Sequence, residues 1–259
     1  ESVNKELTSV IEERKFENDL MELGLSPTRS ILFVGPPGVG KTLAARWLSY
    51  QLARPLLTLD LAAVMSSFLG KTGNNIRAVL NYAQKTPSVL LLDEFDAIAK
   101  KRNDDSEVGE LKRLVTVLLQ AVDDWPSSGI LIAATNHPEL LDPAVWRRFE
   151  RVVRFPNPSS KEIEYAIKSL LGEFSKHEET LIEVLSIILE GNSFADVVRR
   201  INNIRRDSVV QKKPLETLME ELLIGLCKNI ARDRKLIIAL RLVANGMSQR
   251  RVSHLIGIS

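Results

Sequence analysis

The sequence predicts an α/β protein with a parallel sheet sandwiched by helices, followed by a small all-helical domain. Apolar runs of strand length alternate with helical stretches in the first part of the chain, and each connection is long enough for a crossover between parallel strands. After Ser159 only helical patterns follow. The predicted strands are Ile31–Val34, Leu56–Leu59, Val89–Leu92, Ile130–Ala134 and Val152–Phe155.

Helical patterns and chain breaks divide the sequence into three parts. The amphipathic stretches around the strands are 9–23, 41–52, 74–84 and 107–122. Pro156 and Pro158 close this region, and Ser159 with Glu162 forms a capping-box pattern at the start of the next helix. We expect an α/β domain with an N-terminal helix at 1–157, a small helical domain at 158–228 and a helical tail at 229–259.

A glycine-rich loop follows the first predicted strand and opens a helix. Glycine lets the backbone fold round a polyphosphate, so that amide N–H groups and a helix N-terminus face the negative charge. Lys41 can reach the β- and γ-phosphates, and the Thr42 hydroxyl can ligate Mg²⁺. The sequence therefore predicts that a nucleoside triphosphate is bound by Gly35, Pro36, Pro37, Gly38, Val39, Gly40, Lys41, Thr42 and Leu43.

An acidic pair ends the third predicted strand. Asp93 and Glu94 follow four apolar residues, and ligands of parallel sheets collect at the carboxyl ends of the strands. Asp93 is the candidate that holds the Mg²⁺ shell together with Thr42, through water, and Glu94 is the candidate that orients and deprotonates the attacking water.

Three further polar residues follow the fourth predicted strand. The amide of Asn136 can hold the attacking water and sense the γ-phosphate, although asparagine is also a common turn residue. Arg147 and Arg148 are adjacent, and guanidinium groups stabilise charge on a transferring phosphoryl group, often from a second subunit. A basic surface cluster is the alternative interpretation of these two arginines.

Together these motifs resemble the AAA family of ATPases. The segments GPPGVGKT, LLLDEFDAI and AATNHPELLDPAVWRRFE resemble its Walker A, Walker B and sensor-1 plus second-region-of-homology motifs. The resemblance implies the AAA+ fold of the P-loop NTPases, a lid formed by the helical domain, and hydrolysis of ATP with Mg²⁺. It also implies a homo-oligomeric ring, expected to be a hexamer.

The resemblance also assigns individual roles. Asn136 is expected to be sensor 1, and Arg147 and Arg148 are expected to be arginine fingers that reach the ATP of a neighbouring subunit. The segment GNSFAD resembles the lid segment over the adenine, which makes Ala195 a nucleotide-contacting candidate. Asp123 stands where the family carries its intersubunit signal.

The segment between the second and third predicted strands suggests a client. Phe68, Leu69 and Gly70 resemble the family's first pore loop, which projects into the channel of the ring. A large aromatic and aliphatic pair in a polar loop costs solubility unless it grips something, and an aromatic wedge can hold an extended polypeptide. We expect a protein client that is remodelled or unfolded. The alternative is that Phe68 packs into the core.

The C-terminal part supports a second hypothesis. Net charge is +2 overall, but lysine and arginine outnumber acidic residues from Arg199 onward. Residues 235–259 resemble the first two helices of a helix-turn-helix, with a recognition helix expected just beyond Ser259, and Arg250 and Arg251 can meet phosphates. The alternative function is a DNA-linked AAA+ ATPase of transposition, plasmid maintenance or regulation. A helical hairpin packed on the lid is the plainer interpretation.

Other features limit the remaining function classes. The sequence shows no signal peptide and no run of about eighteen apolar residues, so we expect a cytoplasmic protein without a membrane span. No metalloprotease motif is present, and the three histidines form no convincing catalytic triad. A proteolytic role would therefore need a separate protease partner.

Overall fold

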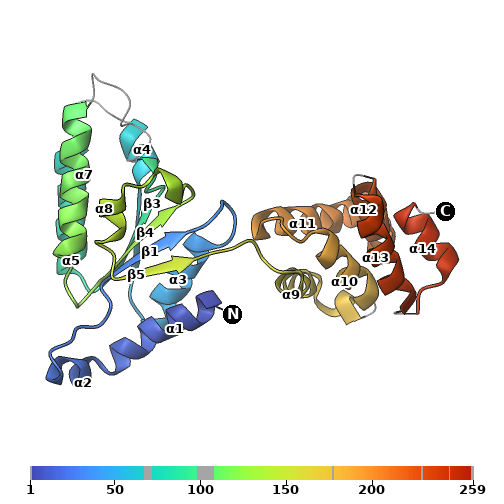
Figure 1. Ribbon diagram of the computed structural model, residues 1–259, viewed down its shortest axis with the longest axis horizontal. Coiled ribbons are helices and arrows are strands. Elements are labelled where there is room, and N and C mark those ends of the chain that lie inside the picture. Colours follow the sequence, from blue (N-terminus) through green and yellow to red (C-terminus); the bar gives the residue numbers. More distant parts are fainter. Residues whose placement is uncertain are drawn as a thin grey trace. The chain divides into compact units, whose positions relative to one another are not determined.

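The computed structural model describes residues 2–66, 72–97, 108–176, 178–228, 230–244 and 246–257. The chain divides into two compact units, Glu1–Pro156 and Asn157–Ser259 (Figure 1). The first unit contains all the strands described, and the second contains helices only.

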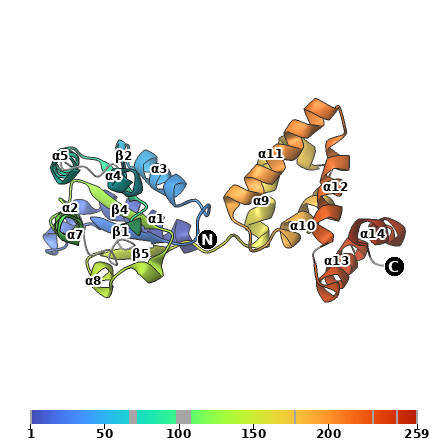
Figure 2. The ribbon, with the colours of Figure 1, turned by 90° about the horizontal axis from the view of Figure 1, so that it is seen from above.

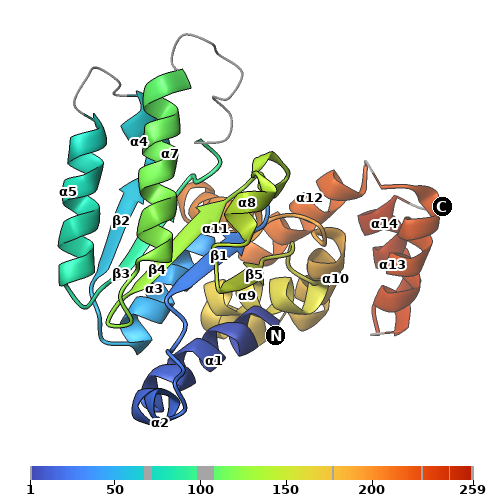
Figure 3. The same cartoon turned by 60° about the vertical axis from the view of Figure 1, so that its left-hand side comes forward.

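The first unit is built on a five-stranded parallel sheet. The strands lie in the order β2-β3-β4-β1-β5, which the labels in Figure 3 follow. All four neighbouring pairs are parallel. Their bounds are Ser30–Val34 for β1, Leu56–Asp60 for β2, Val89–Asp93 for β3, Ile130–Thr135 for β4 and Arg151–Arg154 for β5.

Helices cover both faces of this sheet, as the sequence predicts. Alternate residues of β1 enter two separate hydrophobic cores, because side chains of a strand point to opposite faces. Ile31 and Phe33 pack with α1 and α3, and Leu32 and Val34 pack with α4, α5, α7 and α8. The helix bounds are α1 Ser2–Lys15, α2 Glu17–Glu22, α3 Lys41–Gln51, α4 Leu61–Ser66, α5 Thr72–Lys85, α7 Val108–Asp123 and α8 Pro143–Trp146; a short 3-10 turn, Pro138–Leu140, precedes α8.

The N-terminal helix differs from the expectation of one helix at 9–23. Two helices are present, α1 and α2, with non-helical backbone angles at Phe16 between them. Leu7 and Val10 of α1 are buried against the sheet, whereas α2 has no buried residue. The helical apolar spacing therefore starts earlier than predicted, and only α1 is held by the core.

The second unit is a helical domain with one hydrophobic core (Figure 2). Ser159 caps α9 through the predicted capping box: its backbone N–H donates to Glu162 Oε2 at 2.9 Å, and its hydroxyl accepts from the Glu162 N–H at 3.5 Å. The Ser193 hydroxyl caps α11 by accepting from Asp196 N–H at 3.2 Å. The helices are α9 Ser160–Leu171, α10 Glu179–Ile188, α11 Phe194–Gln211, α12 Leu215–Cys227, α13 Arg232–Ala244 and α14 Gln249–Ile256, with a 3-10 turn at Gly172–Lys176.

The last two helices share the core of the second unit. Ile238 and Leu242 of α13 and Val252 and Leu255 of α14 are buried in the same cluster as residues of α9 to α12. Arg251 of α14 also forms ion pairs with Glu216, at 2.6 Å, and with Glu220 of α12. The division of this region into residues 158–228 and a separate tail therefore stays a prediction. Within the part of the chain that the structure describes, no helix is both long and apolar enough to span a bilayer.

The phosphate loop meets the end of β5 too closely for a side chain. A Cβ on Gly35 would lie 2.1 Å from the carbonyl oxygen of Phe155 and 2.9 Å from its Cβ. The contact is fixed because the Phe155 N–H donates to the Val34 carbonyl at 2.7 Å. Only glycine fits at the point where the chain leaves β1 for the loop.

Gly35→Ala should therefore lower the free energy of unfolding of the first unit by about 1–3 kcal/mol, the usual range for overpacking. Gly225→Ala is the matched control, because a Cβ there meets nothing within 4 Å and alanine favours a helix by about 0.5–1 kcal/mol. Urea unfolding followed by circular dichroism measures both. Wild-type stability of Gly35→Ala would contradict the close approach.

Candidate nucleotide site

The phosphate loop has the backbone that the glycines were expected to allow. Gly38 and Gly40 have positive φ angles, +77° and +102°, which cost glycine no steric strain. The loop ends where α3 begins at Lys41, so the first free N–H groups of that helix lie next to the loop. Val39 is buried in the core between sheet and α3, and Leu43 is 66% exposed.

Lys41 is the most constrained residue of the loop. Lys41 is only 7% exposed, and its Nζ donates to three oxygens. The distances are 2.7 Å to the Gly35 carbonyl, 2.9 Å to the Pro36 carbonyl and 2.7 Å to Asn136 Oδ1. Burial lowers the pKa of Lys41, and nearby carboxylates, including Asp93 and Glu94, act in the opposite direction.

Thr42 and Asp93 meet across the gap between α3 and β3. The Thr42 hydroxyl donates to Asp93 Oδ2 at 3.2 Å, and Asp93 Oδ1 accepts from the Glu94 N–H at 2.9 Å. Hydroxyl and carboxylate oxygens are ligands that Mg²⁺ accepts, usually with waters and substrate phosphates as the rest of its shell. The two side chains therefore fit a magnesium ion that the nucleotide helps to hold. Among the residues described, no cluster of three or more His, Cys, Asp or Glu suits a metal.

Glu94 and Asn136 form the polar edge beside this pair. Glu94 directly follows β3 and has a left-handed backbone, φ +53°, which is uncommon outside glycine. Asn136 directly follows β4, and its Nδ2 lies 3.2 Å from each carboxylate oxygen of Glu94. Because β3 and β4 are neighbours in the sheet, the two side chains meet at its carboxyl edge.

Asn136 thus contacts both Lys41 and Glu94. Its amide oxygen accepts from Lys41, and its amide nitrogen donates to Glu94. This chain of hydrogen bonds connects the phosphate loop to the residue that would activate water. Sequence reasoning had placed these residues in one site but had not predicted that Asn136 would bridge them.

Asp96 is a residue that the sequence analysis missed. It is 1% exposed, and its Oδ1 accepts from the Thr135 hydroxyl at 3.1 Å and from the Asn136 N–H at 3.2 Å. These bonds fix the end of β4 from which the Asn136 side chain projects. The sequence does contain a signal for this role. Asp96 closely follows a buried apolar strand, and a buried aspartate needs hydrogen-bond partners.

The two arginines differ in their surroundings. Arg147 is exposed, and its side chain makes no hydrogen bond or ion pair with any residue in the described ranges. Arg148 forms an ion pair with Asp123 at the end of α7. No hydrogen bond or ion pair among the described residues connects either arginine to the phosphate loop of the same chain.

The remaining predicted residues are Ala195, the pore-loop residues and the two prolines of the phosphate loop. Ala195 is exposed in the first turn of α11, in the second unit. The predicted pore-loop residues Phe68, Leu69 and Gly70 lie outside the described residues. Pro36 contributes its carbonyl to Lys41, and Pro37 is an exposed residue of the loop.

Comparisons with known proteins agree with this geometry. Residues 31–157 match the family described as "ATPase family associated with various cellular activities (AAA)". An uncharacterized AAA family ATPase, y4kL, of Sinorhizobium fredii is 36% identical over 80% of this chain and 62% of that protein. A proteasome-activating nucleotidase of Methanothermobacter thermautotrophicus is 33% identical over 68% of this chain and 45% of that protein.

The chain is thus shorter than these relatives, spanning 62% and 45% of their lengths. The ATP-dependent zinc metalloprotease FtsH of Syntrophotalea carbinolica is 30% identical over 78% of this chain and 32% of that protein. The crystal structure of the FIGL-1 AAA domain shares the fold, with a TM-score of 0.65 and 23% identity over 80% of this chain and 71% of that one. Residues 31–157 therefore form an ATPase domain of the AAA family.

Proposed function

We propose that the chain hydrolyses ATP at a site that a neighbouring copy completes, and that it uses the energy to remodel a protein client. The observation that carries the first part is the position of Asn136 between Lys41 and Glu94. A residue that contacts both the phosphate-binding lysine and the candidate base can couple the state of the γ-phosphate to the activation of water.

The residues of one chain supply binding and proton transfer. The loop N–H groups and Lys41 hold the β- and γ-phosphates, while Thr42 and Asp93 hold Mg²⁺. When bound, Mg²⁺ neutralises charge on the phosphate oxygens. Lys41 Nζ donates to two carbonyls of the loop, so the ammonium lies at the loop that would hold the phosphates.

Glu94 is the proposed general base. Its carboxylate accepts a proton from the attacking water, whose oxygen forms the new bond to the γ-phosphorus as the bond to the bridging oxygen of ADP breaks. Asn136 orients Glu94 by donating to it, and Asp96 orients Asn136. These contacts hold Asn136 and Glu94 in place, which lowers the cost of reaching the transition state.

An arginine from a neighbouring copy supplies the missing positive charge. Arg147 is exposed and has no partner among the described residues, so it is available to a second chain. A guanidinium that reaches the phosphates in trans is worth about 10³–10⁵ in turnover in phosphoryl-transfer enzymes. A closed homo-oligomer gives every site such a neighbour, and a hexameric ring is the assembly we propose.

A protein is the client that we propose. Two relatives carry names linked to protein breakdown, the proteasome-activating nucleotidase and the zinc metalloprotease FtsH. Phe68, followed by Leu69 and Gly70, supplies the aromatic and aliphatic pair that would grip an extended polypeptide. We also propose a separate protease as a partner, because the names of both relatives are linked to protein breakdown. A cytoplasmic location fits this function.

The DNA-linked alternative has less support from the tail. Arg251, one of the two arginines expected to meet phosphates, is already engaged by Glu216 and Glu220. These ion pairs raise the pKa of Arg251 and neutralise its charge locally. The helices α13 and α14 also pack into the core of the second unit, as a helical hairpin would. Salt-sensitive DNA binding that stimulates ATP turnover would favour the alternative.

A mixing experiment tests the shared site. Lys41→Ala should remove phosphate binding but keep the arginines, and Arg147→Ala should bind ATP but lack the proposed finger. Each variant alone should be nearly inactive. A co-expressed 1:1 mixture should recover up to about a quarter of wild-type turnover per chain, because one interface in four then pairs an intact loop with an intact arginine. No recovery in verified mixed oligomers would contradict a site shared between chains.

A trapping experiment tests the client. Glu94→Gln should bind ATP without hydrolysing it and so hold a client during purification. Combining it with Phe68→Ala should lose a protein client, while Glu94→Gln with Tyr82→Ala, a matched exposed aromatic in α5, should retain it. Mass spectrometry identifies the trapped material. Recovery of DNA in place of protein, or retention of client by the Phe68 variant, would count against the proposal.

A further inference from the structure

Arg148 is held by a carboxylate at the end of α7. Its Nη1 donates to Oδ2 of Asp123, the last residue of α7, and the side chains are 37% and 43% exposed. A carboxylate in the last turn of a helix faces the negative end of the helix dipole. The Arg148 guanidinium therefore offsets a charge that α7 itself does not stabilise.

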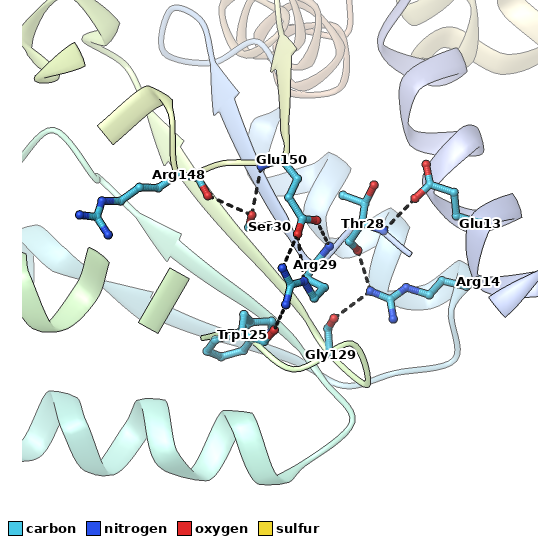
Figure 4. A network of polar contacts seen from close by, with 9 residues as sticks. All are labelled: Glu13, Arg14, Thr28, Arg29, Ser30, Trp125, Gly129, Arg148 and Glu150. Carbon is cyan, nitrogen blue, oxygen red and sulfur yellow. Dashed lines mark hydrogen bonds and ion pairs between the residues drawn. The ribbon is translucent and has the colours of Figure 1, made fainter. Parts of the chain in front are cut away.

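The backbone at Arg148 is held as well, as Figure 4 shows. The Ser30 hydroxyl, at the start of β1, donates to the Arg148 carbonyl at 3.4 Å and accepts from the Glu150 N–H at 3.2 Å. The Ser30 side chain thus connects the two ends of the segment 148–150, which follows Arg147. In Figure 4 the Arg148 side chain leaves this contact in the opposite direction from Ser30.

The Glu150 carboxylate extends this hydrogen-bond network to the turn beyond α7. Its carboxylate accepts from the Arg29 backbone N–H at 2.7 Å and from Arg29 Nε at 2.9 Å. Arg29 Nη1 also donates to the carbonyl of Trp125 at 3.4 Å, and Trp125 is fully buried (Figure 4). The same network therefore fixes the segment that carries Arg148 and the turn that follows Asp123.

Arg147 stands outside this network. Its side chain is exposed and has no hydrogen bond or ion pair with the residues described, so reaching a phosphate costs it no existing bond. Arg148 would have to give up Asp123 to do the same. Arg147 and Arg148 therefore differ in what contact with a phosphate of a second chain costs them. Arg147 loses no bond, whereas Arg148 loses its ion pair with Asp123.

We propose that the two arginines have different tasks: Arg147 is the group that contacts the phosphates of the neighbouring chain, and Arg148 is a positioning residue that acts through Asp123. This inference rests on the proposed function, since it divides the work of the arginines that complete the shared site. Asp123, through the ion pair, links the end of α7 to the segment that presents Arg147.

An exchange of charges tests this division. Arg147→Ala should lower ATP turnover by about 10³-fold or more, and Arg147→Lys should not restore it, because an ammonium lacks the planar fork of guanidinium. Arg148→Ala and Asp123→Ala should each lower turnover by about 10- to 100-fold, the effect of a misplaced group. Arg148→Lys and the exchange of Asp123→Arg with Arg148→Asp both rebuild the ion pair and should recover most of that loss.

An alanine cycle keeps the test independent of the exchange variant. Asp123→Ala combined with Arg148→Ala should be no worse than either single change, because both remove the same interaction. Lys168→Ala is the control: it removes another exposed ion pair, with Glu164 at 2.8 Å, and should leave turnover within about twofold. Thermal melting and ATP affinity should stay near wild type in all variants.

The possible outcomes separate this inference from the proposed function. An exchange variant or an Arg148→Lys variant as inactive as Arg148→Ala, or additive losses in the alanine cycle, would overturn the division of tasks while leaving a shared site in place. Full turnover of Arg147→Ala with a large loss in Arg148→Ala would reverse the assignment. Full turnover of both alanine variants would remove the shared site itself.

Discussion

The buried ammonium of Lys41 is the interaction on which the rest of the site depends. A charge in a residue only 7% exposed needs polar partners, and Lys41 finds them in two loop carbonyls and the amide oxygen of Asn136. That requirement fixes the orientation of the Asn136 amide, which then presents its nitrogen to Glu94. The buried Asp96 holds the Asn136 backbone in turn. The glycines, the lysine and the base are therefore one cooperative unit.

The strand order places this unit at one edge of the sheet. Neighbouring strands β1, β4 and β3 bring the phosphate loop, Asn136 and Asp93 with Glu94 to one edge of the sheet. Arg147 and Arg148 come from the segment between α8 and β5, which is tied to the start of β1 through Ser30 and Arg29. Ser30 and Val34 are the two ends of β1. The Ser30 contacts with Arg148 and Glu150 and the phosphate loop therefore lie at opposite ends of that strand. This separation favours an arginine that serves a second chain.

Most of the fold was predictable from local sequence patterns. The features that depend on long-range contacts were not. The strands were expected within a residue or two, and the serine cap at Ser159 was expected from the sequence, because strand periodicity and capping are local. The break at Phe16 was missed, since it depends on which part of the N-terminal region meets the core. The roles of Asp96 and the Asp123–Arg148 pair join residues far apart in sequence, so spacing alone could not reveal them.

In the proposed function, one chain holds half of a catalytic site. ATP turnover per chain, measured against protein concentration with the assembly state followed by analytical ultracentrifugation, tests it most directly. Turnover per chain should rise as chains associate, while the affinity for ATP stays the same, because binding uses residues of one chain and hydrolysis uses residues of two chains. Equal turnover per chain in the monomeric and assembled ranges of concentration would contradict it.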